Sequence, residues 1–212
     1  MSVRDCLHTA LLSIIPLVSW GTNVVNAEVV ICATENGSGG VYFQGTGSLD
    51  LTDLEYVGTN SPFGFVHPDS GLLGFGGEVD LYTGLTSPGS FGANCGLLGM
   101  TQTQGDPFQL LNDVSFAGVN DTQVGLGVPK DYVSGEPITF SGTVNASFAT
   151  MGLSLAESYY WRWGEGEHAD YVVLQIGTCA VSEPTSLFAV VPIATVLLRR
   201  RTFKQRRSPP GC

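Results

Sequence analysis

Tyr159-Tyr160-Trp161-Arg162-Trp163 and Tyr171-Val172-Val173-Leu174-Gln175-Ile176 are two strand-like runs near the end of the chain. Aromatic and β-branched residues favour strands. Trp161 and Trp163 fall on one face at the strand period of two. The intervening segment, Gly164–Asp170, is short and contains glycine, which is typical of a loop. The two runs therefore predict an antiparallel hairpin.

The same kind of pattern recurs toward the N-terminus. Leu49 and Leu51 alternate with Ser48 and Asp50, which predicts a half-buried strand over Gly47–Leu51. We expect further short strands over 28–33, 41–44, 54–57, 63–66, 72–75, 78–82, 108–111, 114–119, 123–128, 137–144 and 147–153. The last two of these should pair with each other, whereas Ser87–Gly105 reads as a loop. The sequence therefore predicts a single all-β domain, a β-sandwich with the jelly roll as one variant.

Charge is distributed very unevenly along the chain, which has a formal net charge of −10. Between Glu28 and Glu183 there are 18 acidic residues and only two basic ones, Lys130 and Arg162, so this part has a net charge near −16. Six of the nine Lys and Arg residues lie in the last 14 residues. A surface this acidic repels phosphate, so we expect no nucleic-acid partner.

Both ends of the chain resemble targeting segments. Arg4 precedes an apolar run over Leu7–Trp20, and small residues end at Ala27, which predicts a signal peptide over 1–27. The C-terminal apolar run, Thr185–Leu198, is about 21 Å long as a helix. That is short of the ~30 Å hydrocarbon core. Basic residues at a membrane segment stay in the cytoplasm. The basic cluster that stops this segment in the membrane would be Arg199, Arg200 and Arg201. We expect an exported domain that is held in the membrane by this segment.

The order Val181-Ser182-Glu183-Pro184, apolar segment and arginine cluster resembles the PEP-CTERM sorting signal of exported bacterial proteins. Segments 127–138 and 161–170 also look like segments of uncharacterised members of this family. The resemblance implies a signal peptide (1–27), a β-sandwich domain (28–180), a sorting signal (181–207) and a tail (208–212). It further implies cleavage by an exosortase-type membrane enzyme and delivery to the envelope or the extracellular matrix. Ser182 stands where the family usually has proline.

Three cysteines lie between the two targeting segments, at Cys32, Cys95 and Cys179. Cys32 falls in the expected first strand and Cys179 just after the last one. If these strands are neighbours, a Cys32–Cys179 disulfide can form in the oxidising space outside the membrane, and Cys95 would remain free. An odd number of cysteines leaves other pairings open.

The one cluster that suggests chemistry is Trp161, Trp163, Glu165 and Glu167, followed by His168 and Asp170. Aromatic rings stack on sugar faces, and a carboxylate pair can act as acid and base, so this cluster is a candidate glycan contact. The alternative is a hairpin tip whose tryptophans pack on the sheet. His67, His168 and Cys95 lack the spacing of metal ligands, so we expect no metal and no cofactor. Loose calcium binding near Asp50, Asp53 and Glu55 stays open.

Three functions remain open at this stage. The first is a non-enzymatic exported protein, sorted by its C-terminal signal and free of catalytic residues. The second is a carbohydrate-binding module or glycosidase that acts on extracellular polysaccharide. The third is a structural protein that its C-terminal helix anchors permanently in the membrane.

Overall fold

The computed structural model describes residues 28–114, 123–177 and 179. The predicted signal peptide (1–27), the sorting motif Val181–Pro184, the arginine stop Arg199–Arg201 and the tail (208–212) lie outside these residues. The described part contains twelve strands and one short α-helix, which confirms the all-β class. No helix among the described residues is long and apolar enough to cross a membrane.

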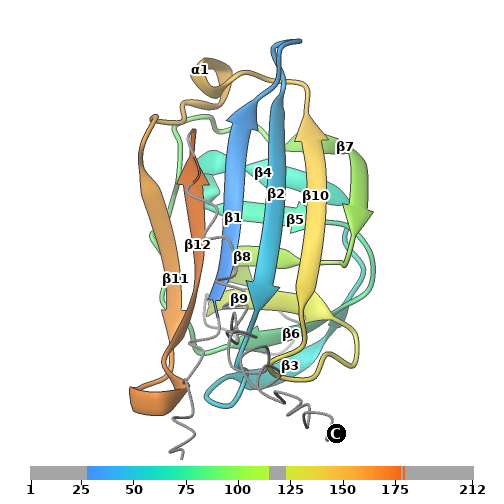
Figure 1. Ribbon diagram of the computed structural model, residues 1–212, viewed down its shortest axis with the longest axis vertical. Coiled ribbons are helices and arrows are strands. Elements are labelled where there is room, and N and C mark those ends of the chain that lie inside the picture. The colour runs from blue at the N-terminus through green and yellow to red at the C-terminus, as the bar shows by residue number, and fades with distance from the viewer. Residues whose placement is uncertain (1–27, 115–122, 178, 180–212) are drawn as a thin grey trace, which may run out of the picture. The chain divides into compact units, whose positions relative to one another are not determined.

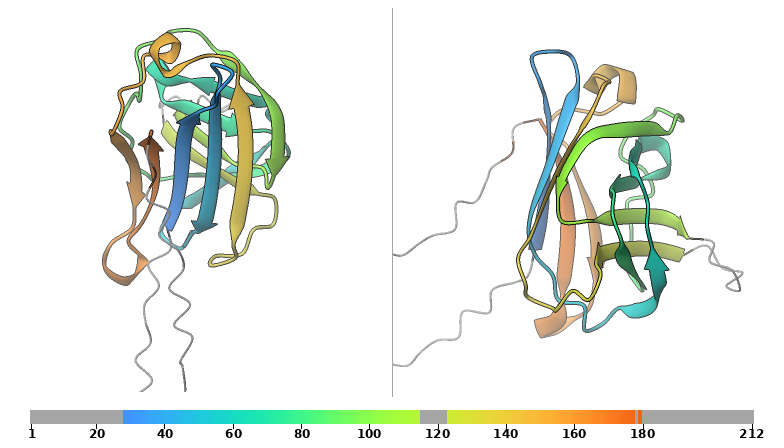
Figure 2. Two further views of the ribbon diagram at one scale, coloured as in Figure 1. Left: turned by 45° about the horizontal axis from the view of Figure 1, so that its top comes forward. Right: turned by 90° about the vertical axis from the view of Figure 1, so that its right-hand side faces the viewer.

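The strands form one curled sheet whose two halves face each other as layers (Figures 1 and 2). In spatial order, the first layer consists of β11 (Ser158–Trp163), β12 (Asp170–Ile176), β1 (Glu28–Glu35), β2 (Val41–Ser48) and β10 (Ile138–Val144). The second layer consists of β4 (Gly64–His67), β5 (Leu72–Phe75), β8 (Gln109–Val114), β9 (Gln123–Pro129), β6 (Val79–Thr83) and β3 (Glu55–Asn60). Figure 1 shows the strands of the second layer running across those of the first.

Strand β7 (Leu98–Gly105) joins the two layers. Its first residues pair with β4 in the second layer, with Gly99 opposite Phe65. Its later residues pair with β10 in the first layer, with Thr101 opposite Thr143. The register shifts just after this pair, and Gln102 adopts a left-handed φ of 56°. A bulge bends a strand and increases its twist, which lets β7 pass from one layer to the other.

The hydrophobic core lies between the layers and is rich in aromatic rings. Phe140 stacks on Phe108 with centroids 4.4 Å apart, and Phe75 lies at the same distance from Phe140. Phe140 is opposite Gly45 of β2, where a Cβ would come within 2.1 Å of its ring. The ring therefore fills the space that the glycine leaves. Cores of this kind supply most of the stabilisation of a two-layer domain.

Strands β1 and β12 are neighbours and run parallel, whereas the other strand pairs in the described part are antiparallel. The predicted hairpin of β11 and β12 is confirmed, with Trp161 opposite Val172. Since β12 runs from Asp170 to Ile176, the chain reaches Cys179 at the end of the strand opposite to the Gly164–Asp170 loop.

Two predictions were wrong about the type of element. Residues 87–105 were expected to form a loop, but Leu98–Gly105 is β7. Its side chains are mostly exposed and polar, so the strand lacks the apolar alternation that a sequence pattern detects. Residues 147–153 were expected to form a strand paired with 137–144, but Phe148–Met151 is the helix α1. Strand β10 pairs with β2 and β7 instead.

The strand predicted over Gly47–Leu51 was also wrong. β2 ends at Ser48, and the residues that follow form a loop. Leu49 and Leu51 are nevertheless buried in the core, while Asp50 between them is partly exposed. The alternation therefore reports the burial of two leucines correctly, but a loop held by side chains from elsewhere produces the same pattern as a strand.

Candidate functional site

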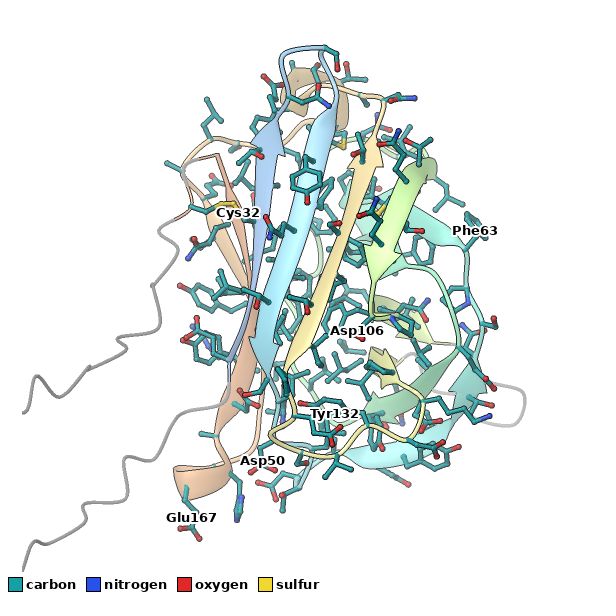
Figure 3. All side chains as sticks on the ribbon, turned by 45° about the vertical axis from the view of Figure 1, so that its right-hand side comes forward. Cys32, Asp50, Phe63, Asp106, Tyr132 and Glu167 are labelled. Carbon is teal, nitrogen blue, oxygen red and sulfur yellow. A yellow bond between two sulfur atoms is a disulfide. The ribbon has the colours of Figure 1, made fainter. Side chains whose placement is uncertain are left out.

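Three loops meet at the end of the first layer that is remote from Cys32. They are the loop after β2 (residues 49–54, the 49–54 loop), the β9–β10 loop and the Gly164–Asp170 loop of the β11–β12 hairpin. Figure 3 shows Asp50, Tyr132 and Glu167, one from each loop, at this end. An open pocket with a volume of about 960 Å³ lies beside them, lined mainly by the hairpin together with Asp53 and Thr86.

The β9–β10 loop holds the 49–54 loop from one side. The Leu49 amide donates a hydrogen bond to the Tyr132 hydroxyl over 2.9 Å, and the Leu51 amide donates to Ser134 Oγ over 3.0 Å. The Gly135 amide donates to the Leu49 carbonyl over 2.9 Å. Buried backbone N–H and C=O groups that are not paired within a sheet need other hydrogen-bond partners. These bonds explain how two buried leucines are accommodated outside a strand.

The β11–β12 hairpin holds the same loop from the other side through three hydrogen bonds, and each of them involves Asp50. The Asp50 amide donates to Asp170 Oδ2 over 2.6 Å. The Trp163 indole Nε1–H donates to the Asp50 carbonyl oxygen over 2.7 Å. His168 Nδ1 lies 2.9 Å from Asp50 Oδ2. Asp50 therefore joins two segments that are more than 100 residues apart in the sequence.

The local environment shifts the pKa of all three titratable groups in this network. Burial raises the pKa of Asp170 to about 6, although two backbone N–H groups partly oppose this by donating to its oxygens. Burial also acts to raise the pKa of Asp50, but hydrogen bonds from Thr52 and His168 lower it below its ordinary value. The hydrogen bond to Asp50 raises the pKa of His168. The His168–Asp50 contact is therefore strongest when the imidazole is protonated.

Asp170 has a structural role. Its two carboxylate oxygens accept the backbone N–H groups of Asp50 and Tyr171, so both are committed to the fold. The pocket is also lined by Asp53, Glu165 and Arg162. These side chains can accept hydrogen bonds from, and donate them to, the hydroxyl or amine groups of a ligand. Among the described residues, no group of three or more His, Cys, Asp or Glu side chains is arranged to hold a metal ion.

The candidate glycan contact through Trp161 and Trp163 requires correction. Both side chains are buried, at 0% and 4% exposure, because their shared face of β11 is the face that packs into the core. Trp161 contacts Phe91 edge-on, with centroids 6.4 Å apart. Covered rings cannot stack on a sugar. Glu165 and Glu167 are exposed in the hairpin loop, and Glu165 also lines the pocket.

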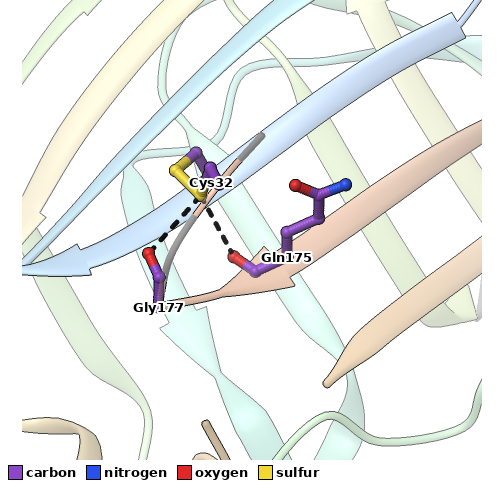
Figure 4. The surroundings of a disulfide bond; sticks show 4 residues. Cys32, Gln175 and Gly177 are labelled. Carbon is purple, nitrogen blue, oxygen red and sulfur yellow. Dashed lines mark hydrogen bonds between the residues drawn. A yellow bond between two sulfur atoms is a disulfide. The ribbon is translucent and has the colours of Figure 1, made fainter. Parts of the chain in front are cut away.

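The structure contains a disulfide between Cys32 and Cys179, with Cα atoms 5.7 Å apart. The bond connects β1 to the residues that follow β12, beside its parallel neighbour. Figure 4 shows the disulfide at Cys32 beside the carbonyl groups of Gln175 and Gly177. The Cys179 sulfur lies 3.7 Å from the Gly177 carbonyl oxygen. Cys95 is free and exposed, and its carbonyl oxygen lies 2.9 Å from His67 Nε2. The disulfide closes nearly the whole described sheet into one covalent loop.

No protein-family model, no curated protein and no solved structure matches this chain. The PEP-CTERM assignment therefore stays a prediction from the residues of the C-terminal segment. The sequence pointed to His168 and Asp170 as members of one cluster with the tryptophans. The hydrogen-bonding roles of Asp50, Tyr132 and Ser134 were not predicted, because their partners are distant in the sequence and no local pattern marks them.

Proposed function

We propose that this protein is an exported, non-enzymatic β domain, sorted to the cell envelope or extracellular matrix by its C-terminal signal. In this proposal an exosortase-type membrane enzyme recognises the motif Val181–Pro184 while Arg199–Arg201 hold the chain at the cytoplasmic side. We also infer that the all-β domain is a β-sandwich, the class to which a jelly roll belongs. The two facing layers with one core between them support this class.

The observation that carries the proposed export is the Cys32–Cys179 disulfide. Disulfides persist outside the cytoplasm and are rare within it. This one connects β1 to Cys179, the last described residue, which lies three positions after the end of β12. A tether beginning beyond Cys179 would therefore pull on a covalently closed sheet. It would also start at the end of β12 opposite to the pocket.

The charge of the domain supports the same proposal. Only two basic residues occur among the described residues, and both have partners there. Lys130 pairs with Glu78 at 2.9 Å, and the Arg162 guanidinium lies over the Tyr160 ring at 4.2 Å. An excess of acidic side chains keeps an exported domain soluble. The basic residues at the C-terminus instead match the positive-inside rule.

The proposal is tested by replacing the sorting motif in the producing cell. Glu183→Ala with Pro184→Ala should leave unprocessed protein in the membrane fraction, because the motif precedes the membrane segment that the enzyme must approach. The matched control is Glu136→Ala with Pro137→Ala, the same dipeptide at an exposed position of the domain. Mass spectrometry of the mature C-terminus reads the result. Normal processing of the motif variant would refute the proposal.

The same measurement distinguishes a sorted and cleaved protein from one that is permanently anchored in the membrane. A structural protein that keeps its C-terminal helix would retain Arg199–Arg201 and the basic residues after them in its mature form. A sorted protein would end near Pro184, in the membrane-proximal part of the motif. The two forms differ by the whole basic tail, so intact-mass analysis of the membrane and medium fractions distinguishes them directly.

A second candidate, a glycosidase, is favoured by the pocket. Its lining includes Asp53 and Glu165, and glycosidases use a carboxylic acid and a carboxylate. If this candidate is correct, Glu165→Gln abolishes the release of reducing sugars from polysaccharide. Glu167→Gln is the matched control, since Glu167 is exposed in the same loop and does not line the pocket. No release of reducing sugar by the unmodified protein would exclude the glycosidase.

A further inference from the structure

The outer face of the first layer carries no charged side chain across its centre. Strand register aligns its outward residues in rows that cross β12, β1, β2, β10 and β7. We call these rows the uncharged face. Its members are Val173, Gln175, Val30, Cys32, Thr34, Tyr42, Gln44, Thr46, Thr139, Ser141, Thr143, Thr101 and Gln104, of which Val173 is buried.

The middle rows show the chemistry of the face. In one row, Gln175, Cys32, Gln44, Ser141 and Gln104 are consecutive cross-strand partners. In the next, Thr34, Tyr42, Thr143 and Thr101 follow one another. Each of these side chains except that of Cys32, which is in the disulfide, carries a hydroxyl or an amide, and such groups both donate and accept hydrogen bonds.

This lack of charge contrasts with the rest of the domain. The described residues include 16 acidic side chains, and none of them belongs to the face. Glu28, Asp106 and Arg162 lie at its border: Glu28 is opposite Tyr171 at the start of β1, and Asp106 accepts the Thr139 amide. A polyanion is repelled by the acidic domain. A polycation would bind to the acidic surfaces of the domain rather than to a face without carboxylates. A neutral polymer is the partner whose charge matches this face.

We propose that the uncharged face binds a neutral polysaccharide laid across the strands. Sugar hydroxyls donate and accept hydrogen bonds as the Thr, Ser and Gln side chains do. The ring of Tyr42, which is 36% exposed, supplies apolar surface for the faces of sugar rings. Strands lie ~4.8 Å apart, so five of them span about 19 Å, which gives room for several sugar units. This site is separate from the pocket and does not depend on processing of the C-terminus.

The test measures binding of the full chain, purified in mild detergent, to cellulose particles and to soluble dextran and amylose. Alginate serves as the anionic comparison. Thr46→Asp places a charge within the face at an exposed strand position, so the fold should tolerate it. Thr59→Asp makes the same change at an exposed position of β3 in the other layer. Circular dichroism and the unfolding midpoint confirm that both variants fold.

We expect binding to at least one neutral polysaccharide and none to alginate. Thr46→Asp should weaken the binding by tenfold or more, roughly 1.4 kcal/mol, and Thr59→Asp should leave it unchanged. Three results would overturn the proposal. They are no binding to any of the neutral polymers, equal binding by both variants, and a dimer that Thr46→Asp dissociates, since a second copy would then cover the face.

Discussion

The two buried tryptophans of β11 differ in a single hydrogen bond. Trp163 Nε1–H donates to the Asp50 carbonyl oxygen, whereas Trp161 Nε1 is buried with no partner in the structure. The two side chains project from the same face of one strand, and both are almost fully buried. They therefore form a natural comparison between a satisfied and an unsatisfied indole.

We predict that Trp163→Phe destabilises the protein more than Trp161→Phe. Both changes remove the same volume, but only the first also removes a hydrogen bond, the one to the part-buried Asp50 carbonyl, which contributes about 0.5–1.5 kcal/mol. Urea unfolding of the two variants gives the comparison. An equal loss of stability would show that the Asp50 carbonyl finds another donor. Both indoles are almost fully buried, so unfolding measurements without ligand report on folding.

Asp170 makes stability depend on pH. Because its pKa is raised from 3.8 to about 6 in the folded protein, the folded state holds a proton that the unfolded state has already lost between these values. The free energy of unfolding must therefore fall as pH rises from about 4 to about 7. The pKa of His168 is also raised in the folded protein, so the free energy of unfolding falls further as pH rises above the pKa of this imidazole in the unfolded chain.

We predict that the unmodified protein is more stable at pH 5 than at pH 7.5, and that Asp170→Asn removes most of this difference. His168→Gln serves as the control that removes the imidazole contribution. Asp50 has the opposite effect on stability. Its pKa is lowered in the folded protein, so its contribution to the free energy of unfolding is lost only as pH falls below the ordinary pKa of an aspartate. Denaturant unfolding at several pH values measures the slope. A slope unchanged in Asp170→Asn would contradict the assignment.

At the level of elements, the arrangement of β1 beside β12 determines what the disulfide does. The two cysteines are 147 positions apart, and parallel pairing of these strands brings them together. In the strand order of the sheet, β12 and its hairpin partner β11 join the rest of the layer through β1, and the disulfide adds a covalent link beside this pairing. The bridge thus secures an edge hairpin that also carries Trp163, His168 and Asp170.

We predict that Cys32→Ser with Cys179→Ser lowers the free energy of unfolding by about 2–5 kcal/mol, the typical range for a native disulfide. The same loss should follow reduction of the unmodified protein. Cys95→Ser is the matched control, and it should have no effect, because Cys95 is exposed and free. An unfolding midpoint insensitive to reduction would show that strand pairing alone holds the hairpin.

Elements with apolar alternation were predictable, and elements built on capping or polar residues were not. The β11–β12 hairpin follows from Trp161, Trp163 and the valines of β12, because one face of each strand is buried. Helix α1 depends on Ser147, whose Oγ accepts the Thr150 amide, and on Gly152 with a φ of 65°. Both signals are present in the sequence, but they mark a helix too short to show a helical period.

At the scale of the whole molecule, the basic residues of the C-terminus and the acidic domain belong to separate parts of the chain. Between Glu28 and Glu183 the charge is near −16, whereas the full chain has −10 and an isoelectric point near 4.5. Removal of the C-terminal segment would therefore leave a more acidic protein. This consequence holds whatever ligand the domain binds.

We predict that the mature protein focuses below the full chain in native isoelectric focusing. The Glu183→Ala with Pro184→Ala variant should keep the position of the full chain, because it retains the six basic residues of its tail. The Glu136→Ala with Pro137→Ala control should focus near the mature form. A mature protein that focuses with the full chain would show that the tail remains attached.

The sequence by itself determined the all-β class, the shared face of Trp161 and Trp163 on β11, and the charge asymmetry. These properties depend on local alternation and composition, which a single strand or segment already displays. Only the tertiary structure decided that Asp50 is fastened by Asp170, that the tryptophans are covered, and that thirteen uncharged residues share one face. Each of these depends on which strands are neighbours and in what register, and pairing between distant segments leaves no local periodicity in the chain.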